Sequence, residues 1–159
     1  MEEYLIISNS SKLHRMAHDS IVYVKGDGNY STFYLSDGSA IQDVVMQLGH
    51  VEKLIELQLK QNGYKFIRLG KSHIINTQFV KSIETGVGTL TMFCYSNLLK
   101  PEIYADKITD FSELKSHNPA IKAIPHDYKV KIEYKTIEIK ASSEALRRLK
   151  EQIEKLYSI

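Results

Sequence analysis

The sequence predicts a mainly β protein with some helix, an α+β fold of packed antiparallel sheets with one short helix and, at the carboxyl end, a β-hairpin and a second helix. Three observations carry this prediction. Short runs of β-branched and aromatic residues recur through the first hundred residues. A helical apolar stripe occurs only once before residue 140, and the last thirty residues alternate like strands before a second helical stripe begins.

The amino-terminal runs predict strands at 4–7, 21–24 and 30–35. Between the second and third runs, Gly26-Asp27-Gly28-Asn29 supplies residues that tolerate a positive φ and therefore predicts a turn. A returning strand at 40–46 follows Asp37-Gly38, and an Asp-Gly pair between two β-type runs is a strong hairpin signal.

The apolar period changes at Leu48. From there to Leu59, apolar residues fall at positions i, i+3, i+6, i+7 and i+11, which places them on one side of a helix. Asn62-Gly63 is a typical helix end. Strand-like runs then return at 64–69, 73–75, 80–83, 89–95 and 98–100.

The carboxyl end begins with a proline-containing stretch. We therefore expect a division into a first domain at 1–115, a connector at 116–128 and an appendage at 129–159. In the appendage, Lys135-Thr136 is predicted to be the two-residue turn of a hairpin. Ser142 is predicted to cap a final helix, whose apolar stripe is Leu146, Leu149, Ile153 and Leu156.

Composition argues against several classes of protein. Cys94 is the only cysteine, so the chain cannot form an intramolecular disulfide or a cysteine-rich zinc site. The amino terminus has no basic segment before an apolar stretch, and no run approaches the ~20 apolar residues of a membrane span. We expect a cytoplasmic protein that does not bind membranes.

The charge is distributed unevenly along the chain. Residues 1–116 hold 12 Lys and Arg against 13 Asp and Glu, a net charge of −1, whereas the remaining residues hold nine against six, a net of +3. Proteins that bind nucleic acid usually show a strongly basic domain. DNA binding by residues 1–116 would therefore depend on a local patch.

Catalytic constellations are weak in this sequence. His14 and His18 have the i,i+4 spacing that could hold a metal on a helix, but their segment has no helical stripe and is better explained as loop or strand surface. The glycines at 26–31 do not form a G-x-G-x-x-G motif, and no serine lies in a G-x-S-x-G elbow. We expect no enzyme, no catalytic residue, no metal site and no cofactor.

Binding candidates are better represented. Lys65, Arg68 and Lys71 concentrate hydrogen-bond donors together with Ser72 and His73. A turn at 69–72 could lift Lys71 and Ser72 clear of a sheet, where they could meet a phosphate or a base edge. An edge strand kept soluble by its charges would show the same composition, so composition alone leaves both interpretations open.

The order of the motifs resembles the LytTR family of DNA-binding domains over about residues 1–115. The family opening D-I-x-Y-x-E-A-x-G-N-Y is matched in part by Asp19, Ile21, Tyr23 and Gly28-Asn29-Tyr30. The family block F-x-R-x-H-R-S-Y-I-V-N is matched at Phe66, Arg68, Ser72, Ile74, Ile75 and Asn76.

The resemblance implies packed antiparallel sheets whose loops enter successive major grooves of double-stranded DNA at direct-repeat promoter sites. It places Asn29 in the first loop, Lys71 in the second, and a third loop near Asn97 to Glu102. Asn29 and Lys71 would then read bases. The residues expected to hold phosphates are Tyr30, Lys65, Arg68, Ser72 and Lys100.

The chain also departs from the family pattern. Gly70 stands where the family commonly has histidine, and Lys100-Pro101-Glu102 replaces the usual Ser-Arg. Family members often follow a phosphoacceptor receiver domain, whereas this chain begins with its first strand, so we expect no phosphoryl signal within the chain. Residues 129–159 lie outside the resemblance and could be extra structure, a homodimer contact or a site for a regulatory protein. The alternative function is accordingly a protein-interaction module on a LytTR-like scaffold.

Overall fold

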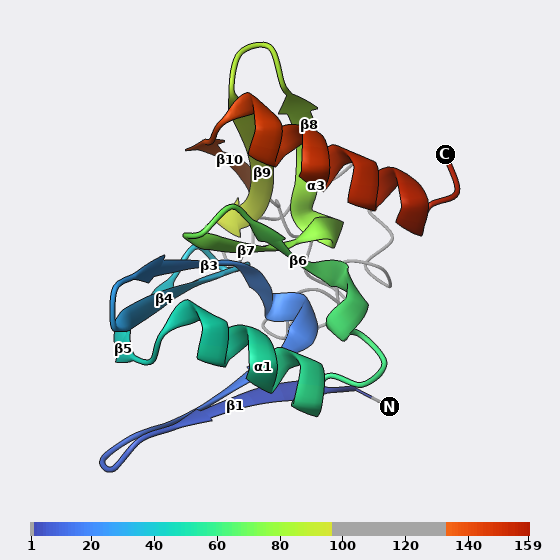
Figure 1. Ribbon diagram of the computed structural model, residues 1–159. Helices are drawn as coiled ribbons and strands as arrows, with labels where there is room; N and C mark the ends of the chain where they lie inside the picture. The colour runs from blue at the N-terminus through green and yellow to red at the C-terminus, as the bar shows by residue number, and fades with distance from the viewer. Residues whose placement is uncertain (1, 97–132) are drawn as a thin grey trace, which may run out of the picture.

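The computed structural model describes residues 2–96 and 133–159, and these residues form three layers (Figure 1). A five-stranded antiparallel sheet lies in the middle. The helix α1 (Leu48–Gln58) and a two-stranded sheet cover one face, and a three-stranded sheet with the helix α3 (Ser143–Leu156) covers the other. The expected α+β class, with packed antiparallel sheets, is confirmed.

The central sheet has the strand order β5-β4-β3-β7-β6, and every neighbouring pair is antiparallel. Its strands are β3 (Ile21–Asp27), β4 (Tyr30–Leu35), β5 (Ala40–Val45), β6 (Phe66–Leu69) and β7 (His73–Asn76). The hairpin expected at Asp37-Gly38 joins β4 to β5, and Gly38 has a φ of +87°, which glycine adopts without a steric penalty.

The first covering layer is built on α1. The strands β1 (Tyr4–Ser8) and β2 (Leu13–Ala17) pair into a hairpin that lies against the helix. Alternate residues of these strands, such as Leu5 and Ile7, are buried with the apolar stripe of α1 against the central sheet. The stripe predicted from Leu48 therefore faces the core, although the helix ends at Gln58 and Gly63–Lys65 forms a 3-10 turn instead of a strand.

The second covering layer contains β8 (Val80–Glu84), β9 (Thr89–Ser96) and β10 (Glu133–Lys140) in the order β10-β9-β8. The helix α3 packs with them over the opposite face of the central sheet. Ser142 caps this helix as predicted, because its hydroxyl accepts a hydrogen bond from the amide of Ala145 at 3.1 Å. Leu146 and Leu149 are fully buried.

The predicted carboxy-terminal hairpin is wrong. Residues 133–140 form one continuous strand, and each of them, Lys135 and Thr136 included, faces a residue of β9. The alternation of apolar residues changes phase near 135–136, and that change resembled a turn although it lacks the Gly or Asn that tight turns favour. Pairing with the eight residues of β9 determines the conformation instead. Residues 97–132, which include the expected strand at 98–100 and the connector, lie outside the described residues.

Candidate nucleic-acid interface

Two turns and the start of α1 meet at one end of the central sheet. Asp27 pairs with Tyr30, which leaves Gly28-Asn29 as the tip of the β3–β4 hairpin. Leu69 pairs with His73, so 70–72 form the β6–β7 turn, and β3 and β7 are neighbours in the sheet. We call this end, made up of residues 28–30, 45–47 and 70–73, the loop end (Figure 1, left).

The β3–β4 turn carries the first group of polar side chains. Gly28 has a φ of +60°, and glycine at the first central position suits the two-residue turns that join antiparallel strands. Asn29 and Tyr30 are exposed, with Tyr30 at 48% of its full accessibility. Gln47, the residue before α1, donates a hydrogen bond from Nε2 to Oδ1 of Asn29 at 3.0 Å. The turn is therefore tied to the helix entrance.

The β6–β7 turn is held from two sides. Arg68 donates from Nη2 to the carbonyl oxygen of Lys71 at 3.1 Å and from Nε to that of Gly70 at 3.4 Å. The amide of Gly26 on β3 donates to the carbonyl oxygen of Ser72 at 2.7 Å. These bonds fix the turn backbone while the side chains of Lys71 and Ser72 stay exposed.

Gly70 occupies this turn for a conformational reason. Its φ is +59°, in the left-handed region where a side chain is strained. The family commonly has histidine at this position, but the positive φ of the turn favours glycine.

Two lysines bring positive charge to the loop end, Lys71 within it and Lys25 beside it, while the exposed Asp27 at the end of β3 adds a negative charge. Lys71 and Lys25 are both exposed, and Lys25 lies opposite His73 in the sheet register. Burial lowers the pKa of His73, and the charge of Lys25 lowers it further. Lys25 directly precedes the turn predicted at 26–29, and the pairing of β3 with β7 also brings it beside the second turn, which the sequence does not show.

The structure gathers some of the predicted site residues and separates others. Asn29, Tyr30, Lys71 and Ser72 lie together at the loop end. Lys65 precedes β6 and so lies at its opposite end, where Nζ is 3.5 Å from Oε1 of Gln78. The predicted Asn97 and Lys100 lie outside the described residues.

Arg68 lies close to the loop end, but its guanidinium is already engaged. Besides the turn carbonyls, it contacts Oε1 of Glu52 on α1 at 3.4 Å. The side chain is about one-third exposed, so this ion pair is well solvated and contributes little to stability by itself. The bonds to the turn make Arg68 a support for the loop.

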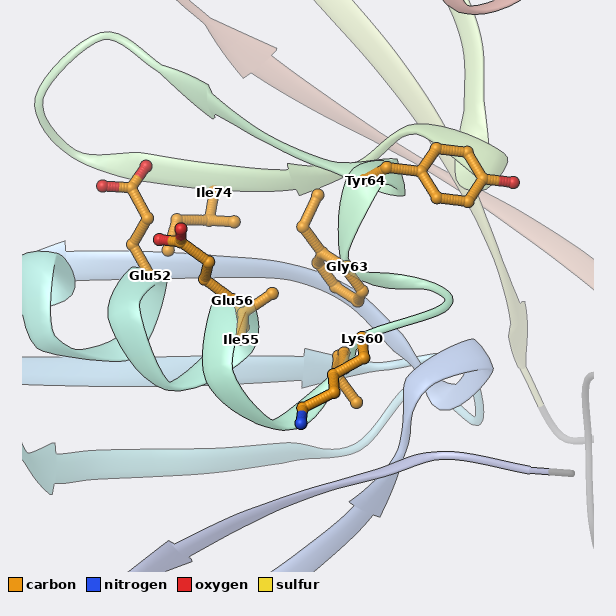
Figure 2. Close-up of a pocket in the computed structure, with 9 residues that line it drawn as sticks. Glu52, Ile55, Glu56, Lys60, Gly63, Tyr64 and Ile74 are labelled. Carbon is orange, nitrogen blue, oxygen red and sulfur yellow. The ribbon is translucent and has the colours of Figure 1, made fainter.

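A hollow of about 380 Å³ opens between α1 and β6, away from the turns (Figure 2). Its apolar lining comes from Ile55, Leu59, Phe66 and Ile74, and charged groups such as Glu52 and Lys60 stand at its rim. The lining includes no Ser, Thr, Cys or His.

Among the described residues, no group of three or more His, Cys, Asp or Glu side chains could hold a metal ion. His14 lies on the strand β2, and His18 begins the short 3-10 turn after it, so the two residues are not neighbours on a helix. The described helices also include none that is long and apolar enough to cross a membrane.

The arrangement of the layers has a counterpart among solved structures. It is similar to the LytTr DNA-binding domain of a protein described as a methyl-accepting/DNA response regulator from Bacillus cereus, with a TM-score of 0.50. The match covers 96% of this chain and 98% of that one, at 9% sequence identity. The fold is that of a LytTR DNA-binding domain.

At this low identity the likeness concerns the LytTR fold alone. A match over 96% of the chain must extend beyond residue 115, where the sequence resemblance ended, into the carboxy-terminal strand and helix. Comparisons with models of protein families and with curated proteins find no match.

Proposed function

We propose that this protein binds double-stranded DNA in a sequence-specific manner and regulates transcription, with its loops entering the major groove. The observation that carries the proposal is the loop end, where two neighbouring turns present Asn29, Tyr30, Lys71 and Ser72 together. The DNA-binding domain with the same fold supports it.

The size of each turn suits this function. The two turns join four neighbouring strands in the order β4-β3-β7-β6, so each turn ends its own two-stranded ribbon, whose strands lie about 4.8 Å apart. A major groove about 12 Å wide accepts a two-stranded ribbon, so either turn is narrow enough to enter it. Loops that pre-exist in one backbone conformation also avoid part of the ordering cost of binding.

The side chains divide into two roles. Asn29 and Lys71 are proposed to reach base edges, and Tyr30 and Ser72 to hold phosphates beside them. Lys25 adds charge at the same end, while Arg68 keeps the second turn in shape. A third loop from 97–102 and direct-repeat target sites remain part of the proposal.

Lys71→Ala tests the proposal. The wild-type chain should form a complex with the fragment upstream of its own operon, measured by mobility shift or fluorescence anisotropy at several salt concentrations. Affinity should fall steeply with salt because phosphate contacts release counterions. Lys71→Ala should weaken binding. If the ammonium contacts a phosphate, the variant should also reduce by about 1 the slope of the logarithm of the affinity against the logarithm of the salt concentration.

The matched control is Lys155→Ala, which removes the same charge in the last turn of α3, at the far end of that helix. This variant should bind like the wild type. The absence of any complex at low salt, or equal losses in the two variants, would contradict DNA binding through the loop end.

A second candidate, a protein-interaction module that uses residues 129–159, retains one supporting observation. The end of α3 leaves Tyr157 and Ile159 exposed at 60% and 85% of their full accessibility. A homodimer or a regulatory-protein complex through this end should show in the mass measured by light scattering after size exclusion. Tyr157→Ser with Ile159→Ser should return the mass to that of one chain, and a monomeric wild type would argue against the homodimer.

A further inference from the structure

Asn29 and Gln47 form a hydrogen-bonded amide pair at the tip of the loop end, although 18 residues separate them in the sequence. Both side chains are exposed, and the bond from Nε2 of Gln47 to Oδ1 of Asn29 measures 3.0 Å. An exposed bond between two amides contributes little to stability, because water offers the same partners. Its effect lies in the orientation that it gives to Asn29.

Buried contacts bring the two residues together. Gly26 lets α1 approach β3 so closely that a Cβ on it would lie 2.8 Å from Cβ of Leu48, the residue after Gln47. On the other side, the buried hydroxyl of Ser31 donates to the carbonyl oxygen of Met46 at 2.7 Å. The backbone on either side of Gln47 is thus fixed against the hairpin that carries Asn29.

The pair changes what Asn29 can offer to DNA. A free asparagine recognises adenine with both ends of its amide, donating to N7 and accepting from the N6 amino group. In this structure Oδ1 accepts from Gln47, which uses one of its two lone pairs and directs the oxygen toward the helix entrance, so the two hydrogens on Nδ2 are left to face a partner. A donor group matches an acceptor edge, and guanine presents two acceptors, O6 and N7, in the major groove.

We propose that Asn29 and Gln47 recognise DNA as one unit, in which Gln47 sets the Asn29 amide so that its donors face an acceptor edge such as that of guanine. The inference rests on the proposed function and deepens it, because it adds Gln47 as a specificity-determining residue. No motif in the sequence pointed to Gln47, since its contact with Asn29 depends on how the start of α1 meets β3 and β4.

The pair can be tested first without DNA. In the free protein, the side-chain amide resonances of Gln47 should shift when Asn29 is changed to Ala, and those of Asn29 should shift in Gln47→Ala. Unchanged resonances would overturn the pair as a structural unit, whatever the protein binds.

The second test is a double-mutant cycle on DNA with Asn29→Ala, Gln47→Ala and the combination. Asn29→Ala should weaken binding by about ten- to a hundredfold, the usual effect of losing one base contact. The combined variant should bind no more weakly than Asn29→Ala, because Gln47 acts through Asn29. Losses that multiply would overturn the inference and leave DNA binding intact, whereas no binding by the wild type would overturn both.

Gln47→Glu provides the specificity readout. A carboxylate only accepts hydrogen bonds, so the Asn29 amide must turn round and present its oxygen to the groove. Selection from a randomised site should then move the preferred base from guanine toward one that presents an amino group. Gln42→Glu, a control at an exposed position of β5, adds the same charge and should keep the wild-type preference. An unchanged preference in Gln47→Glu would overturn the inference.

Discussion

Among the residues that the structure describes, His18 and His73 are the two histidines whose environment clearly disfavours the charged form. Burial lowers the pKa of His18 by more than the charge of Asp19 raises it, and the weaker effect of Lys65 lowers it again. Burial also lowers the pKa of His73, with Lys25 acting in the same direction. Both rings are therefore expected to be neutral in the folded protein near neutral pH.

Stability should therefore fall as the pH drops below neutrality. Above the usual histidine pKa of about 6.5, both rings are neutral in the folded and the unfolded chain. Below it, the unfolded chain takes up protons first, so stability is lost down to the lower pKa of the folded state. The urea midpoint should be lower at pH 5.5 than at pH 7.5, and His18→Gln with His73→Gln should reduce the difference.

The carboxylate of Glu3 also makes the stability fall as the pH drops, but in a separate, lower pH range. Burial raises the pKa of Glu3, but hydrogen bonds from Gln61 and Asn62 outweigh that effect and lower it below its usual value. Its contribution is lost only as the pH falls below that usual value, near 4.5. Measurements above pH 5 therefore report the histidines, and an equal or higher midpoint at pH 5.5 would contradict their role.

At the scale of elements, α1 joins the loop end to the core. Its stripe packs against the central sheet, its first turn contacts Gly26, and Glu52 reaches Arg68 under the β6–β7 turn. Gln58, the last residue of the helix, accepts a hydrogen bond from the amide of Ile6 at 2.7 Å and donates one to its carbonyl oxygen at 3.0 Å. These bonds satisfy backbone groups of β1 on the edge away from β2. The helix thereby orients strands that are far apart in the sequence.

Gly26→Ala should disturb this arrangement. The added Cβ would meet Leu48 at 2.8 Å, so the start of α1 must move away from β3. Overpacking of this kind usually costs about 1–3 kcal/mol of unfolding free energy. Urea denaturation should show that loss, and DNA affinity measured under native conditions should fall as well because Gln47 moves.

The matched control is Gly49→Ala in the same helix, where a Cβ would meet nothing within 4 Å. Alanine is the better helix former, so this variant should gain about 0.5–1 kcal/mol. A Gly26→Ala protein as stable as the wild type would show that the contact with Leu48 relaxes without cost.

At the scale of the whole molecule, the carboxy-terminal elements complete the core. The apolar cluster between the central sheet and the upper layer contains residues of β3, β6 and β7 together with Leu90, Ile139, Leu146 and Leu149. Residues of the central sheet and of the carboxy-terminal elements therefore share one packed interior, and the final helix is expected to unfold together with the sheets.

Leu149→Ala tests this expectation. Truncation of a fully buried leucine usually costs about 2–5 kcal/mol, so the single urea transition should move to a lower concentration. The control Leu57→Ala, at a position 62% exposed on α1, should change stability by less than about 0.5 kcal/mol. A loss below about 1 kcal/mol for Leu149→Ala would show that α3 is only loosely attached.

Sequence patterns identified most elements correctly where local chemistry dominates. The Asp37-Gly38 turn, the apolar stripe from Leu48 and the Ser142 cap each depend on residues within a few positions of one another. The hairpin at Lys135-Thr136 failed because the long partner strand β9 outweighed a local phase change. Local patterns cannot report a partner strand whose residues lie 37 to 51 positions away.

The candidate site shows the same division. Lys71 and Ser72 could be chosen because a glycine-containing turn and polar residues coincide there, and Asn29 and Tyr30 because the LytTR resemblance places them at the first loop. Lys65 was chosen with them, although the direction of β6 carries it to the other end of the strand. Only the pairing of β3 with β7 shows that Lys25 lies beside the second turn, and Gln47 could not be chosen because its position follows from the contact of α1 with β3.

The sequence by itself determined the α+β class, the turns and the polar residues that the turns carry, because turn chemistry and apolar periodicity act over short stretches of chain. Only the tertiary structure decided which turns meet at one end, that Arg68 supports a loop, and that Gln47 orients Asn29. These depend on register and on helix–sheet packing, which are set by contacts between segments far apart in the sequence.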